Sequence, residues 1–83
     1  MNREGVFKEI ILIFRDVFDD DELKVGEETN SQDIDDWDSL EHINLILAMQ
    51  NQFKVKFDLD EVAELKNVGE MVDLIVKKVN ERE

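Results

Sequence analysis

The sequence contains no cysteine and no proline, and glycine occurs only at positions 5, 26 and 69. Without cysteine, neither a disulfide framework nor a thiolate metal site is available to stabilise this chain of 83 residues. The scarcity of glycine and the lack of proline leave little sign of the tight turns that join β-hairpins. These absences favour a helical protein that is stabilised by an ordinary apolar core.

Basic residues are also scarce, with ten lysines and arginines against 22 acidic residues and a net charge of −12. Such a charge repels nucleic acids and anionic membranes, so neither is an expected partner. Residues 16–41 hold twelve of the acidic residues and only one basic residue, Lys24, so this stretch carries nearly all of the net charge. An acidic stretch of this kind is either a solvated loop or a docking surface for basic proteins.

Long apolar runs are missing as well. No stretch is long enough to span a bilayer, and the first residues lack the apolar segment of a signal peptide. The expected location is the cytoplasm. The length corresponds to one domain over residues 1–83, with a core from about 4 to 79, and we expect a monomer.

Apolar residues recur at helical spacing and predict amphipathic helices over residues 4–18, over 39–53 and from 67 onward. A shorter helix is expected over 59–65, capped by Asp58. Residues 54–57 alternate like a strand, but no second strand is available for pairing, so we expect a loop. The predicted fold class is all-α: a small four-helix bundle of three longer helices and a short third one. The connection over 19–37 is unusually long for a compact domain, which indicates a function.

Two of these helices have apolar faces that can be assigned. The last helix has a continuous stripe, and its start shows a capping-box pattern formed by Asn67 and Glu70. The stripe consists of Val68, Met71, Val72, Ile75 and Val79. The second helix is expected to face inward with Ile43, Ile46, Leu47 and Phe53, and Leu45, Ala48 and Met49 widen its apolar face.

The segment Asp38-Ser39-Leu40 carries the strongest functional signal. Asp38 is expected to cap the second helix by accepting the N–H of Leu40 or Glu41, while Glu41 reaches back to the N–H of Asp38. Ser39 then occupies the first helical position with its hydroxyl in solvent, where the helix N-terminus favours an attached anion. The same tripeptide is also common at helix N-termini, where it serves only as a cap, so the tripeptide alone does not establish a function.

The wider pattern resembles the acyl carrier protein family, whose hallmark is Asp-Ser-Leu with 4′-phosphopantetheine on the serine. The motif here is Asp36-Trp37-Asp38-Ser39-Leu40-Glu41, and residues at the family's spacing follow it at Phe53, Phe57, Leu65 and Val68. The resemblance covers about residues 4 to 79. It implies that a phosphopantetheinyl transferase moves the arm from coenzyme A to Ser39, and that the arm's thiol carries acyl groups as thioesters. It also implies a carrier that catalyses nothing itself and has no catalytic residue.

The resemblance further implies an acyl pocket between the helices. The residues expected to line it are Ile43, Leu47, Met49, Phe57, Leu65 and Met71. Met71 stands where the family often has a small residue, which indicates a narrower or differently shaped pocket.

Acyl-transfer or condensing enzymes with basic docking surfaces are the other partners that the resemblance implies. The exposed face of the second helix is usually acidic in the family, but here it carries Asn44, Gln50, Asn51 and Gln52. We therefore expect docking through the acidic residues Asp33, Asp35, Asp36 and Glu41, with Asp38 beside them. This departure indicates a specialised carrier in fatty-acid, polyketide or related lipid or cell-surface biosynthesis.

Two alternatives remain open. The first is an aminoacyl carrier, of the D-alanyl or peptidyl kind, although peptidyl carriers usually show Gly-Gly-x-Ser. The second is an acidic helical adaptor or inhibitor with an unmodified Ser39.

Other chemistries find less support. His42 follows Ser39 by three residues, but no Gly-x-Ser-x-Gly signature accompanies the pair, so we expect an exposed histidine beside the arm. The acidic clusters at 33–36 and 58–61 lack the glycine and glutamate positions of an EF-hand, so no dedicated metal site is expected. Trp37 is expected to fold onto the core.

Overall fold

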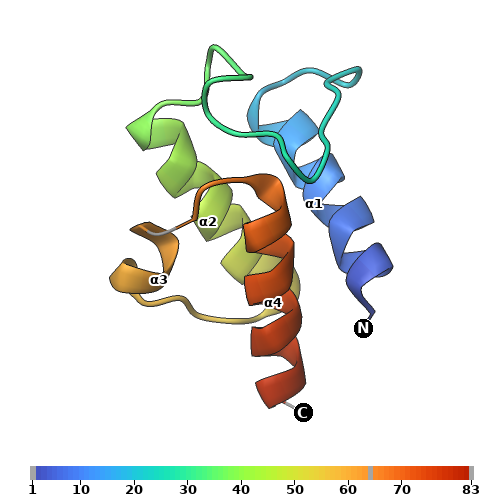
Figure 1. Ribbon diagram of the computed structural model, residues 1–83, viewed down its shortest axis with the longest axis vertical. Helices are drawn as coiled ribbons and strands as arrows, with labels where there is room; N and C mark the ends of the chain where they lie inside the picture. The colour runs from blue at the N-terminus through green and yellow to red at the C-terminus, as the bar shows by residue number, and fades with distance from the viewer. Residues whose placement is uncertain (1, 64, 83) are drawn as a thin grey trace.

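The computed structural model describes residues 2–63 and 65–82 and contains four α-helices over this part of the chain. They are α1 (Arg3–Val17), α2 (Ser39–Phe53), α3 (Leu59–Ala63) and α4 (Val68–Arg82). In Figure 1, α1 runs antiparallel to α2 and α4 and packs against both, while the short α3 lies beside α2. The described residues include no β-strand, so the predicted all-α bundle is confirmed. No helix in the described part combines the length and apolarity needed to cross a membrane.

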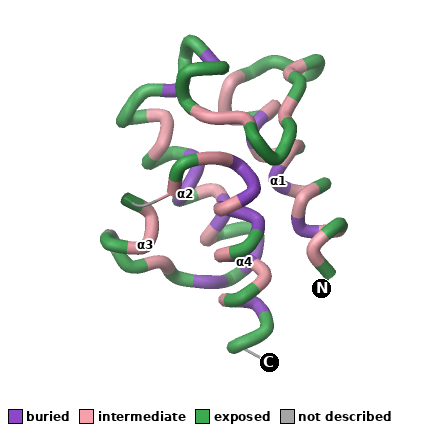
Figure 2. The backbone as a smooth tube through the Cα atoms, in the orientation of Figure 1, coloured by how far each residue is buried: buried purple, intermediate pink, exposed green. Residues whose placement is uncertain are grey.

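The core forms where α1, α2 and α4 face one another (Figure 2). α1 contributes Val6, Ile10 and Phe14, and the long loop adds Ile34 and Trp37. The predicted stripe of α4 is confirmed, because all five of its members are at most 3% exposed. Apolar side chains at helical spacing on three helices thus close one shared interior.

The inward face of α2 differs in part from the prediction. Leu45, Ile46, Met49 and Phe53 are buried, but Ile43 and Leu47 are 56% and 55% exposed, so their inward placement was wrong. The side of α2 that carries these two residues faces α3, whose five residues are too few to cover it. The amphipathic pattern alone does not reveal this, because the apolar residues of α2 extend beyond the face that α1 and α4 cover.

The connection between α1 and α2 is irregular but anchored to α4. The N–H of Val68 donates to the carbonyl of Thr29 at 2.9 Å, and the N–H of Gly69 donates to the carbonyl of Glu27 at 2.8 Å. A Cβ on Gly69 would lie 3.1 Å from the Glu27 carbonyl oxygen, so glycine permits this close approach. The loop thereby supplies acceptors for the first amides of α4, which otherwise lack partners.

The helix boundaries follow the predicted ones closely. α2 spans the predicted range, and α1 begins and ends one residue earlier than predicted. The short helix ends at Ala63, so Leu65 is not helical, while Glu64 lies outside the described residues. Residues 54–57 form the expected loop.

Only one of the two hydrogen bonds of the predicted capping box of α4 is present. The Asn67 side chain accepts the Glu70 N–H at 2.9 Å. The Glu70 carboxylate accepts the N–H of Lys66 at 3.2 Å, one residue before the expected donor.

Candidate functional site

The start of α2 is closed by Asp38. Its backbone is extended, its Oδ1 accepts the Glu41 N–H at 2.9 Å, and its carbonyl accepts the His42 N–H at 2.9 Å. The predicted return contact is wrong, because the Glu41 carboxylate accepts from Asn44 at 2.7 Å and the Asp38 N–H donates to the Asp36 carbonyl. A single side chain therefore provides the cap.

Ser39 is exposed at the first helical position, and its hydroxyl makes no hydrogen bond with any described residue. The amides of Ser39 and Leu40 also find no acceptor among the described residues. Free amides at a helix start favour an attached anion by about 0.3–1 kcal/mol at an exposed position. The local geometry therefore fits a phosphodiester on the Ser39 oxygen.

A surface groove of about 500 Å³ adjoins Ser39. On one side it is formed by the start of α2, and on the other by α3 and the residues that follow it. Its lining includes Ser31, Trp37, Ser39, His42, Val62 and Leu65. The groove thus opens directly at the exposed hydroxyl.

A second, smaller pocket of about 190 Å³ continues along α2. It is lined by His42, Ile43, Ile46, Leu47, Gln50, Phe57 and Val62. Since His42, Ile43 and Val62 line both cavities, these residues form the boundary between them.

His42 is held at this boundary from two sides. The Trp37 indole N–H donates to His42 Nδ1 at 3.2 Å, and the two rings are stacked with centroids 6.0 Å apart. His42 Nε2 lies 3.4 Å from the Val62 carbonyl of α3. Trp37 in turn packs edge-on against Phe14, as expected for a loop aromatic folded onto the core. His42 was expected to be exposed, and this is wrong, because its contacts leave it half-buried.

The residues proposed for the pocket separate into two groups. Ile43, Leu47 and Phe57 line the smaller pocket, and Leu65 lines the groove beside Ser39. Met49 and Met71 are each 1% exposed in the core and line neither cavity.

The acidic residues proposed for docking lie on the exposed loop before α2. Asp33, Asp35 and Asp36 are exposed, and Asp33 accepts the Asn30 N–H at 3.0 Å. Glu41 is partly buried on the first turn of α2. The described residues contain no cluster of three or more side chains suited to hold a metal ion.

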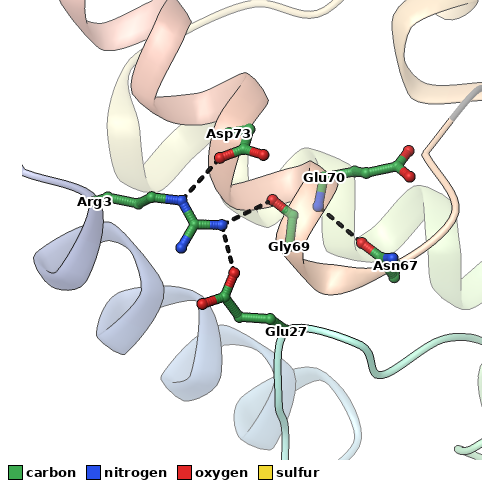
Figure 3. A network of polar contacts seen from close by, with 6 residues as sticks. All are labelled: Arg3, Glu27, Asn67, Gly69, Glu70 and Asp73. Carbon is green, nitrogen blue, oxygen red and sulfur yellow. Dashed lines mark hydrogen bonds and ion pairs between the residues drawn. The ribbon is translucent and has the colours of Figure 1, made fainter.

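The most connected charged residue lies outside this region. Arg3 donates to Glu27 at 2.5 Å, to Asp73 at 2.8 Å and to the Gly69 carbonyl at 3.5 Å (Figure 3). The hydrogen bonds that Arg3 donates to Glu27, first, and to Asp73, second, raise the pKa of Arg3, and the hydrogen bond from Arg3 lowers the pKa of Glu27. This network joins the start of α1 to the loop and to α4.

Residues 8–75 match the family described as Phosphopantetheine attachment site. An acyl carrier protein of Lactobacillus acidophilus is 31% identical over 75 residues, covering 90% of this chain and 94% of that protein. The chain belongs to the acyl carrier protein family. A relative from Picosynechococcus is 33% identical over 78 residues, which cover 94% of this chain and 95% of that acyl carrier protein.

Solved structures of the family agree with the fold. The solution structure of a holo acyl carrier protein from Geobacter metallireducens aligns with a TM-score of 0.87 at 45% identity, covering 93% of this chain and 88% of that one. A crystal structure of the Thermotoga maritima acyl carrier protein aligns at 0.85 with 22% identity, covering 100% of this chain and 96% of that one, and supports the fold alone. As a member of this family the protein is a carrier that bears covalent 4′-phosphopantetheine and not an enzyme.

Several residues of the site were not predicted from the sequence. Val62, Gln50 and Ser31 line the cavities, but their spacing carries no signal for this. One feature of the sequence could have indicated the Trp37–His42 contact: the two aromatic residues lie five positions apart across the start of a helix. Arg3 contacts residues 24 and 70 positions away, which no local pattern reveals.

Proposed function

We propose that the Ser39 hydroxyl oxygen is the attachment point of the 4′-phosphopantetheine arm, and that the protein carries acyl groups on it. The observation that carries this proposal is the exposed Ser39 hydroxyl at the first position of α2, left free because Asp38 makes the cap. The arm supplies a terminal thiol that holds acyl groups as thioesters.

The residues of this chain then have separate tasks. Asp38 fixes the first turn of α2 and therefore the position of the Ser39 oxygen. The amides of Ser39 and Leu40 stabilise the negative charge of the attached phosphodiester. The groove beside Ser39 and the smaller pocket along α2 shelter the arm and its cargo from water.

The acidic loop residues are the proposed docking surface, contributed by Asp33, Asp35 and Asp36, with Glu41 on α2. The partners are a phosphopantetheinyl transferase and acyl-transfer or condensing enzymes with basic surfaces. Charge complementarity of this kind speeds encounter more than it tightens binding, which suits a carrier that visits several enzymes. The cargo belongs to fatty-acid, polyketide or related lipid or cell-surface biosynthesis, and mass spectrometry of the thioester isolated from cells identifies it.

Intact-mass measurement tests the attachment. The purified protein is incubated with coenzyme A and a broad-specificity phosphopantetheinyl transferase, beside the variants Ser39→Ala and Ser31→Ala. Ser31 is the matched control, because it is also an exposed serine lining the same groove. Wild type and Ser31→Ala are expected to gain one arm, and Ser39→Ala none. An arm on Ser39→Ala, or none on wild type, refutes the proposal.

A further inference from the structure

The Trp37 contact fixes which nitrogen of His42 carries the proton. An indole N–H is a donor only, so His42 Nδ1, which lies 3.2 Å away, must accept. The neutral imidazole then carries its hydrogen on Nε2. That nitrogen is a donor on a residue that lines both the groove and the smaller pocket.

The acceptor that this donor has is a poor one. Nε2 lies 3.4 Å from the Val62 carbonyl, beyond the usual N–H···O range of about 2.7–3.2 Å. The same carbonyl also receives the Leu65 N–H, again at 3.4 Å. An incoming oxygen atom at a shorter distance can therefore replace Val62 as the partner of His42 at little cost.

Gln50 offers a second donor deeper in the smaller pocket. Its Oε1 accepts the Phe57 N–H at 3.0 Å, which assigns the amide orientation and leaves the NH₂ group without an acceptor among the described residues. Position 50 follows 42 by eight residues on the same helix face, about 12 Å along the axis. The remaining lining of this pocket is apolar: Ile43, Ile46, Leu47, Phe57 and Val62.

We propose that this carrier is adapted to acyl chains that bear a hydroxyl or oxo oxygen, which accepts a hydrogen bond from His42 Nε2–H or from the Gln50 amide. The inference rests on the proposed function, because the chain must reach the pocket from an arm on Ser39. The apolar walls contact the hydrocarbon part, and the two donors select the oxygen. His42 and Gln50 are therefore specificity-determining residues for the cargo.

Loaded proteins test this selection. The transferase attaches octanoyl, 3-oxooctanoyl, 3-hydroxyoctanoyl or 8-hydroxyoctanoyl arms from the matching coenzyme A thioesters, and intact mass verifies each product. The measured quantity is the rate at which hydroxylamine cleaves each thioester. The variants are His42→Leu and Gln50→Leu, which remove a donor at similar volume. Asn51→Leu is the control, since Asn51 is exposed on α2 and lines neither cavity.

One neutral hydrogen bond corresponds to about a three- to tenfold change in rate. We expect His42→Leu or Gln50→Leu to speed cleavage of at least one oxygen-bearing thioester by about this factor, while octanoyl cleavage is unchanged or slower. Equal effects on octanoyl and all oxygen-bearing chains in both variants overturn the inference. Should one variant fail to fold by circular dichroism, the other carries the same comparison. Failure to load any arm on Ser39 instead refutes the proposed function.

Discussion

The Asp38 carboxylate accepts the backbone N–H of Glu41 at 2.9 Å, and this one contact closes the first turn of α2. Ser39, which lies between these two residues in the sequence, takes no part in the cap and keeps its hydroxyl exposed. Under the proposed function, capping and modification are thereby divided between two adjacent side chains. This division lets a bulky group be attached without loosening the helix.

Loss of that cap should be measurable. Asp38→Ala is expected to lower the free energy of unfolding by about 0.5–2 kcal/mol, and Tm falls by roughly 4–8 °C per kcal/mol in a domain of this size. Asp38→Asn keeps a good capping oxygen and should stay near wild type. Thermal unfolding followed by circular dichroism measures both. Equal losses in the two variants would show that the charge of Asp38, and not its cap, stabilises α2.

The contact between Phe14 and Trp37 predicts a far larger effect. Phe14 is fully buried, and its ring centroid lies 5.2 Å from that of Trp37. Phe14→Ala should cost about 3–5 kcal/mol, which approaches the whole stability of a small domain at about 0.05–0.15 kcal/mol per residue. We expect a largely unfolded protein by Trp37 fluorescence. Leu12→Ala on the same helix, where Leu12 is 62% exposed, should fold normally.

The helices and the Asp38 cap could be predicted from the sequence, because both depend on neighbouring residues within one or two helical turns. Apolar spacing predicted the observed limits of α2, and Asp38 was expected to accept the N–H of Leu40 or Glu41, of which the structure shows that of Glu41. The outward positions of Ile43 and Leu47 were not accessible, because they depend on how little of α2 the short α3 covers. The same holds for His42, whose partners come from two other parts of the fold: Trp37 from the loop before α2, and Val62 from α3.

The Arg3 network predicts a small, salt-sensitive contribution to stability. Arg3 contacts Glu27 and Asp73 on side chains that are 40–67% exposed, where screening by water and salt weakens ion pairs. Arg3→Gln should lower Tm by less than Asp38→Ala does, and added sodium chloride should narrow the difference from wild type. Lys8→Gln is the control, because the one ion pair of Lys8 among the described residues is an exposed pair with Glu4 at 3.5 Å. A decrease in the Tm of Arg3→Gln that persists at high salt would contradict an ionic origin of this stabilisation.

The proposed docking surface predicts a kinetic defect without a folding defect. Charge reversal by Asp35→Lys together with Asp36→Lys should slow transfer of the arm to Ser39, because the steering charge is lost. The control is Asp21→Lys with Glu22→Lys, which makes the same charge change earlier in the same loop. Initial transfer rates at low salt, followed by intact mass, measure the difference. Equal slowing in both pairs would indicate a dependence on net charge alone.

Glu61 connects α3 to α4 and predicts a pH dependence. Its carboxylate accepts the Asp58 N–H at 3.0 Å and pairs with Lys78 at 2.8 Å. The pKa of Glu61 is lowered below its ordinary value of 4.5, first by the hydrogen bond from the Asp58 N–H and second by the hydrogen bond from Lys78. In turn, the hydrogen bond to Glu61 raises the pKa of Lys78 above its ordinary value of 10.5. The Glu61 contribution is therefore complete above pH 4.5 and lost as the pH falls through the lowered pKa. The Lys78 contribution is complete below pH 10.5 and lost as the pH rises through the raised pKa.

The variant Glu61→Gln isolates this charge, because glutamine still offers an oxygen to the Asp58 N–H. Its Tm should lie below that of wild type throughout the neutral range, and the difference should shrink as the pH falls below 4.5 and wild-type Glu61 takes up a proton. Glu28→Gln, an exposed position in the loop between α1 and α2, controls for the change in net charge. A Tm difference that stays constant from neutral pH to acid would assign the loss to packing, since only the ionised carboxylate can lose its advantage on protonation.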